Sequence, residues 1–255
     1  MVFEKNFLAL ILISVIVLLG MIFIPFKEEF FLTRYFITSF GQFFVILLVA
    51  IIGYERIKSF TFKSAIGKSI IFISLGMLSW GIGALIWFYY NTILNTEVPY
   101  PSLADIGFLG TIPLAAFGLL LLLKDIKIEF DIKTILKLIL IPIIVFIFTY
   151  WLFISTKLAE DVSALEKILN VTYPMGDMVF LSFTFVILTL IKGGKLFKPF
   201  GIICLGFIIE SIADFSFSWT TAIETYYSGN WVDMLFVLAF FTLGLGIYYT
   251  KQLQE

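Results

Sequence analysis

Eight apolar stretches, each close to the length of a bilayer-crossing helix, constrain this chain more than any other feature. A helix needs about 20 apolar residues to cross the hydrocarbon core of a membrane. The first stretch is longer than the apolar region of a signal peptide, and no small-residue cleavage site follows it. The sequence therefore predicts an all-α, polytopic transmembrane helical bundle, which forms a single integral membrane domain over residues 1–255. Its expected spans are residues 6–26, 35–55, 68–91, 105–123, 134–155, 174–191, 199–221 and 232–250.

Composition supports this prediction and excludes several kinds of chemistry. Hydrophobic residues make up 61% of the chain and charged residues 14%, whereas soluble domains carry about 25% charged residues. The net charge of −1 and the lack of a basic cluster argue against a nucleic-acid partner, so the expected partner is the lipid bilayer. The chain has no histidine, which excludes His-ligated haem, His-based zinc sites and Ser-His-Asp catalysis. We expect no catalytic residue, no metal site and no cofactor, and the sequence leans away from an enzyme.

The distribution of basic residues predicts how the chain is threaded. Cytoplasmic connections of membrane proteins carry an excess of Lys and Arg. Thirteen of the 17 basic residues lie at the two ends of the chain or in its second, fourth and sixth connections. The other four are Lys27, Arg34, Lys157 and Lys167. We therefore expect a multi-pass protein of the cell membrane with both termini in the cytoplasm.

Three short segments repeat a pattern in which an aspartate stands at the start of an apolar stretch. They read PYPSLADIGFL, YPMGD and NWVDMLF, and their aspartates are Asp105, Asp177 and Asp233. Each aspartate is predicted at the N-terminal end of a helix that enters from the outer side. Stretches three and four, five and six, and seven and eight would then be three copies of one helical hairpin. The sequence predicts a bundle built from repeated helical hairpins.

Two interpretations of these aspartates are open. In the structural one, Ser102 and Asp105, like Asn230 and Asp233, have the spacing of a helix capping box, and the helix dipole favours each acid by about 0.3–1 kcal/mol. In the functional one, the three carboxylates converge on an outer vestibule where aromatic faces help to attract a cation. The aromatic residues expected to line that vestibule are Tyr100, Tyr173, Trp231 and Trp87.

The seventh stretch carries two acids near its middle, Glu210 and Asp214. They are four residues apart and therefore share one helix face, with Ser218 continuing that face outward. A charged side chain at this depth costs roughly 2.5–3.5 kcal/mol on insertion scales, so it normally faces the bundle interior. One interpretation is a protonated pair that holds helices together, and the other is a proton-responsive, cation-responsive or ligand-binding site.

The segments SWGIGALIWFYYN, PYPSLADIGFL, YPMGD, IADFSFSW and GNWVDML together resemble a known pattern. It is similar to the eight-span membrane region that precedes diguanylate cyclase or histidine kinase modules in some microbial signalling proteins. The resemblance extends from about Gly76 to Tyr249 and implies a sensing or anchoring role without enzymatic activity. The printed chain ends at Lys251-Gln-Leu-Gln-Glu, so we expect any signal to pass to a separate cytoplasmic or membrane partner.

Two classes of function remain after these exclusions. The first is a ligand-binding, sensory or scaffold module of the membrane without its own output domain. The second is a small proton- or cation-coupled secondary transporter, because intramembrane carboxylates and hairpin repeats suit coupled transport. The repeats run parallel rather than inverted, which favours the first class.

Overall fold

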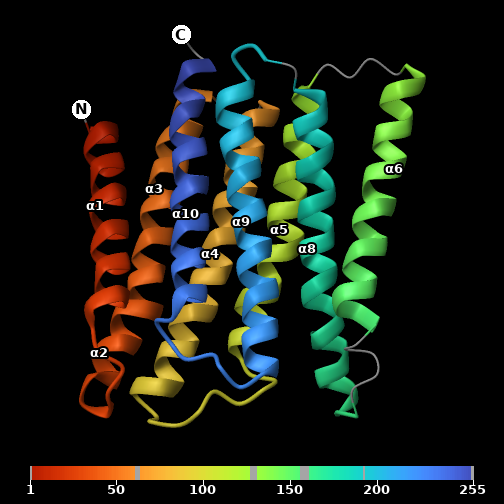
Figure 1. Cartoon of the computed structure of the whole chain (residues 1–255). Coiled ribbons are helices and arrows are strands. Elements are labelled where there is room, and N and C mark those ends of the chain that lie inside the picture. The colour runs from red at the N-terminus through yellow and green to blue at the C-terminus, as the bar shows by residue number, and fades with distance from the viewer. Residues whose placement is uncertain (1, 61–63, 127–130, 156–160, 192, 254–255) are drawn as a thin grey trace.

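The computed structural model describes the chain except for residues 1, 61–63, 127–130, 156–160, 192 and 254–255 (Figure 1). The described residues form helices and short connections, with no strand among them. Eight helices or continuous helical runs in this part of the chain are long and apolar enough to cross a bilayer. The predicted all-α bundle of eight spans is therefore confirmed.

The elements follow the predicted order, with some runs divided into more than one kind of helix. They are α1 (Val2–Phe23), η1 (Glu28–Phe30), α2 (Phe31–Tyr35), η2 (Phe36–Phe40), α3 (Gly41–Phe60), α4 (Ala65–Thr92), α5 (Ala104–Asp125), α6 (Ile132–Thr149), η3 (Tyr150–Ile154), α8 (Ala164–Leu190), α9 (Phe197–Ala222), α10 (Trp231–Tyr249) and η4 (Thr250–Leu253). The elements from η1 to α3 form one continuous run, and η2 within it is a π-helical turn.

The long helices stand side by side, and both chain termini lie at the same end of the bundle (Figure 1). The α4–α5 and α9–α10 connections lie at the opposite end. Helix α10 lies in the core, where Phe240, Leu243 and Ile247 are fully buried. Helix α6 stands at the edge. This arrangement fits an even number of spans, whereas the side of the membrane that each end faces remains a prediction.

The outer surface of the bundle is apolar, as the lipid environment requires. Ile16 on α1 and Ile144 on α6 are 60% and 62% exposed. In water, such residues would turn inward, but hydrocarbon solvates them as well as a protein core does. The helical conformation pairs most backbone N–H and C=O groups within each span, which is the other condition for crossing a bilayer.

Glycines let neighbouring helices approach closely within the two best-packed hairpins. A Cβ atom added at Gly107 of α5 would lie 2.7 Å from Cα of Gly83 on α4 and 2.8 Å from the carbonyl oxygen of Ser79. In the α9–α10 hairpin, a Cβ atom at Gly246 would lie 2.8 Å from the backbone nitrogen of Ile203. Both hairpins therefore depend on the absence of a side chain at specific positions.

The sixth span is longer than predicted. The sequence places its start at residue 174, but α8 begins at Ala164, where Ser163 and Glu166 form a complete capping box. Pro174 lies inside the helix instead of in its first turn. The helix begins at this earlier position because the side chains of Ser163 and Glu166 accept hydrogen bonds from backbone N–H groups at the helix start. Residues 164–173 are thus the first turns of the span.

The glycine contact predicts a clear effect of substitution. Gly107→Ala should destabilise the protein by about 1–3 kcal/mol, because the methyl group would press on the backbone of α4. Thermal unfolding in detergent would measure this loss. The matched control is Gly201→Ala on α9, whose added Cβ atom would have nothing within 4 Å. Equal melting temperatures for the two variants would contradict the close packing of α4 and α5.

Candidate functional site: an acidic and aromatic cavity

A cavity of about 440 Å³ lies among the helices toward the end of the bundle away from the chain termini. Helices α4, α5, α8, α9 and α10, the η2–α3 region and the segment 98–100 contribute to its wall. All five carboxylates that the sequence singles out line this cavity: Asp105, Asp177, Glu210, Asp214 and Asp233. No lysine or arginine lines it among the described residues, so the cavity gathers negative charge without a cationic side chain.

Asp105 is held by neutral donors at the start of α5. Its carboxylate accepts hydrogen bonds from the backbone N–H of Ser102 at 2.6 Å, from the Ser102 hydroxyl at 3.2 Å and from the hydroxyl of Tyr173 at 2.6 Å. The Ser102 hydroxyl in turn accepts from the N–H of Ala104 at 3.2 Å. The predicted capping box is therefore only partly formed, since Leu103 and not Ser102 is the N-cap, and Asp105 also joins α5 to α8 on the cavity wall.

Asp233 repeats this arrangement at the start of α10. It accepts from the backbone N–H of Gly229 at 2.7 Å, from Gln42 Nε2 at 3.3 Å and from the hydroxyl of Tyr226 at 3.2 Å. Burial raises the pKa of the Tyr226 hydroxyl well above its ordinary value, so this group keeps its proton and donates it. Asn230 caps the helix by accepting from the N–H of Val232 at 2.9 Å. In both the α4–α5 and the α9–α10 hairpin, an aspartate at the start of the second helix thus accepts hydrogen bonds from a backbone N–H and a tyrosine hydroxyl.

Arg34 fixes the turn that carries Asp233, from outside the cavity. Its guanidinium donates to the carbonyl oxygens of Ile24, Ser228 and Gly229 at 2.6, 3.2 and 2.9 Å. It also lies 5.2 Å from the ring centre of Tyr227. The same turn is therefore bound on one side by Arg34 and on the other by the Asp233 carboxylate.

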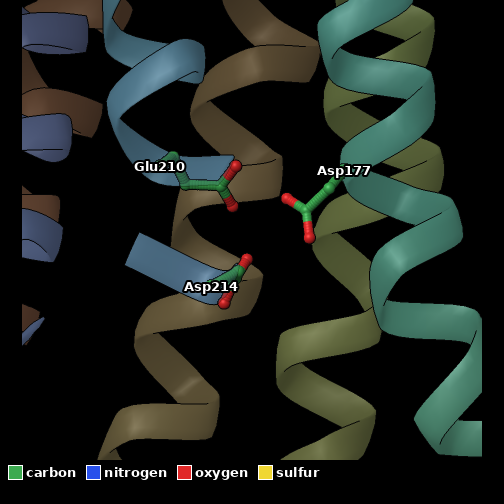
Figure 2. Close-up of side chains that lie close together, drawn as sticks. All are labelled: Asp177, Glu210 and Asp214. Carbon is green, nitrogen blue, oxygen red and sulfur yellow. The ribbon is translucent and has the colours of Figure 1, made fainter. Parts of the chain in front are cut away.

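Three carboxylates meet deeper in the cavity, where Asp177 of α8 points toward Glu210 and Asp214 of α9 (Figure 2). One oxygen from each residue lies within 4.8 Å of the others. Asp177 and Glu210 are only 3% and 2% exposed. Oδ1 of Asp177 and Oε2 of Glu210 have no hydrogen-bond partner. Like charges this close repel strongly in an apolar interior, so the cluster needs protons or a bound cation to balance it.

The position of Asp177 differs from the sequence prediction. The YPMGD segment suggests a helix start, but Asp177 lies about three and a half turns into α8. Asp177 therefore does not cap a helix. The hairpin that contains α6 and α8 thus lacks the aspartate at a helix start that the other two hairpins share. The longer helix carries Asp177 inward to the depth of Glu210, which the sequence places near the middle of its own span.

Three of the four aromatic residues predicted for the vestibule lie on the cavity wall. Trp87, Tyr100 and Tyr173 line the cavity, and so does the predicted polar residue Ser218. Trp231 does not, because it is 49% exposed and lies beside the Arg34 turn. As the first residue of α10, it points away from the helix face that carries Asp233 two positions later.

Several lining residues are not among the site residues that the sequence predicts. The aromatic ones are Trp80, Phe108, Phe180, Phe217, Tyr226 and Phe236. The polar ones include Thr38, Ser39 and Gln42, which come from the π-helical turn η2 and the start of α3. Such turns often occur at functional sites because they shift the register of one helix face. The clue in the sequence was the polar pair Ser39 and Gln42 in an otherwise apolar stretch.

Comparison of the chain with family models, curated proteins and solved structures finds no match. The fold and the cavity alone therefore define its class. Eight membrane-length helices with an apolar exterior make it a multi-pass membrane protein. Its distinguishing internal feature is the cavity of carboxylates and aromatic rings.

The two kinds of carboxylate should respond to neutralisation in opposite ways. Asp177→Asn should stabilise the cation-free protein by about 1–3 kcal/mol, because it removes a charge that lacks a partner. Asp105→Asn should destabilise it by about 1 kcal/mol, because it weakens hydrogen bonds at the helix start. Thermal unfolding in detergent with a chelator present measures both. A loss of stability in Asp177→Asn would contradict the finding that Oδ1 of Asp177 has no hydrogen-bond partner.

Proposed function

We propose that this multi-pass membrane protein is a ligand-binding module whose cavity accepts a small organic cation. The observation that carries the proposal is the gathering of five carboxylates in one cavity that no described lysine or arginine lines. Burying this charge is costly for the protein, and a positively charged ligand would offset the cost. A neutral or anionic ligand would leave the charge unbalanced.

The aromatic rings support an organic cation rather than a fully hydrated ion. Trp87, Phe217 and Tyr226 line the same cavity as the carboxylates. Trp80 packs against Phe236 and Phe240 at ring-centre distances of 5.2 and 4.6 Å, which gives this wall a rigid support. A desolvated cation over such rings gains about 2 kcal/mol per good contact. The volume of about 440 Å³ lies in the range of small-molecule sites.

Choline and its neutral isostere 3,3-dimethyl-1-butanol test this proposal with the purified protein. Choline should bind with saturation in isothermal titration and raise the melting temperature, whereas the alcohol should do neither. Trp87→Leu should weaken choline binding about tenfold or more, because it removes a ring that faces the cavity. Trp231→Leu is the matched control and should bind choline normally, since Trp231 lies outside the cavity.

Equal binding of choline and the alcohol would show that the cavity selects shape and not charge, which would contradict the proposal. Equal weakening by Trp87→Leu and Trp231→Leu would place the ligand elsewhere. Choline has to be tested alongside smaller amines such as methylammonium, because the carboxylates set the charge of the ligand more tightly than its size. Failure of every cation in this series would remove the proposed function.

We further propose a sensory use of the module, with α10 as the link to a signalling partner. Asp233 lies in the first turn of α10 at the cavity, and the far end of the same helix is tied to α1. There, Lys251 forms an ion pair with Glu4 at 2.9 Å, and the Tyr248 hydroxyl donates to Glu4 at 2.6 Å. A shift of α10 on ligand binding would therefore move the contacts with Glu4 at the other end of the bundle. Ligand-dependent co-purification of a partner tests this step.

Coupled transport is the second candidate, and the cluster of Asp177, Glu210 and Asp214 favours it. Ionisable groups at membrane depth often mark ion pathways. A transporter would take up labelled choline into proteoliposomes against its gradient when an ion gradient is imposed. A pure binding module would show saturable binding without accumulation.

A further inference from the structure

We propose that Asp177, Glu210 and Asp214 form a binding site for a hard divalent cation of about the size of Ca²⁺ at the floor of the cavity. The inference goes beyond the proposed function: it shares the cavity with the organic cation but concerns a different ligand and a different set of side chains. Two helices contribute, α8 with Asp177 and α9 with the other two acids (Figure 2).

The donor atoms select the class of metal. The three residues offer carboxylate oxygens alone, which suit Ca²⁺, Mg²⁺ and Mn²⁺ better than softer ions. Cys204 is not part of the cluster, and the chain has no histidine, so the nitrogen and sulfur ligands that favour zinc or copper are lacking here.

The spacing of the donor atoms allows one ion to contact all three residues. The three oxygens lie within 4.8 Å of one another. This limit is about twice a Ca²⁺–oxygen distance of 2.3–2.6 Å, so one ion can reach all three with small side-chain movements. Mg²⁺ has shorter bonds of about 2.1 Å and demands near-ideal octahedral geometry, whereas Ca²⁺ accepts irregular sets of carboxylates, so three acids from two helices suit Ca²⁺ better.

Unsatisfied polar atoms provide the independent sign of a ligand. Oδ1 of Asp177 and Oε2 of Glu210 are buried without a hydrogen-bond partner. Buried polar groups are nearly always paired in folded proteins, so two unsatisfied carboxylate oxygens in one cluster indicate a missing partner. A cation would engage the two carboxylate oxygens, with water from the cavity completing its shell.

Charge explains why the ion should be divalent. The cluster holds three carboxylates, and the cavity has no lysine or arginine in its described lining. A monovalent ion would leave two negative charges in an apolar interior, whereas a divalent ion leaves one. Asp214 is only half-buried and lies on the α9 face that Ser218 continues toward the cavity mouth, which gives the ion a polar route of entry.

Calcium titration of chelator-treated protein in detergent tests the site. We expect one Ca²⁺ per chain with half-saturation at or below about 1 mM, the range of weak calcium modules. The double variant Asp177→Asn, Glu210→Gln should weaken binding at least 100-fold. Glu97→Gln is the matched control and should bind Ca²⁺ normally, because Glu97 is exposed and does not line the cavity.

Terbium luminescence provides a second readout that does not depend on heat changes. Tb³⁺ at the cluster should be sensitised by the tryptophans of the cavity, and Ca²⁺ should displace it. No saturation by about 10 mM Ca²⁺, or unchanged Ca²⁺ binding in the double variant, would overturn the inference. The double variant is expected to fold, because both substitutions remove unpartnered buried charge.

The outcomes separate this site from the proposed function. Calcium binding without choline binding would leave the metal site standing and remove the organic cation. Choline binding without calcium binding would do the reverse. If Na⁺ displaced Tb³⁺ and lowered its luminescence whereas Ca²⁺ did not, the assignment of a divalent ion would be overturned.

Discussion

The need to keep carboxylates away from lipid organises this bundle. Five acids lie at membrane-embedded or near-embedded positions, and the outer face of the helices is apolar. A carboxylate facing hydrocarbon would cost several kcal/mol, so all five have to point toward a common interior. Close helix contacts at Gly83 and Gly107 bring α4 and α5, which both line that interior, against each other. The cavity is thus a consequence of where the charges have to be placed.

The protein handles these charges in two different ways. Asp105 and Asp233 accept hydrogen bonds from backbone N–H groups and tyrosine hydroxyls, so each is stabilised without a cation. Asp177 and Glu210 have oxygens without such donors. Proteins tolerate destabilising arrangements of this kind where binding or catalysis uses them. The contrast between the two groups is the main reason to place a ligand at the cluster.

The sequence predicted the fold well because hydrophobic length is a local property. All eight spans were expected, and most boundaries differ by only a few residues. The second span is also longer than predicted, at Glu28–Phe60. The largest error, the start of α8, arose because Tyr173-Pro174 resembles a helix start, whereas Ser163 and Glu166 cap the helix earlier. Because α8 begins earlier than predicted, Asp177 lies at the floor of the cavity and not at its rim.

The candidate site was only partly predictable, since it depends on contacts between helices. Glu210 and Asp214 were singled out because acids in an apolar stretch are costly. Their proximity to Asp177 could not be read from the sequence, because it follows from the packing of α8 against α9. The exposed position of Trp231 likewise depends on how α10 is rotated in the bundle.

Anomalous diffraction from crystals soaked in Tb³⁺ would test most directly whether the cavity binds cations through its carboxylates. The account predicts one strong anomalous peak between Asp177, Glu210 and Asp214, and none beside Asp105, whose carboxylate is already satisfied. Carboxyl groups bonded to one another with no peak nearby, and a lipid chain filling the cavity, would contradict it.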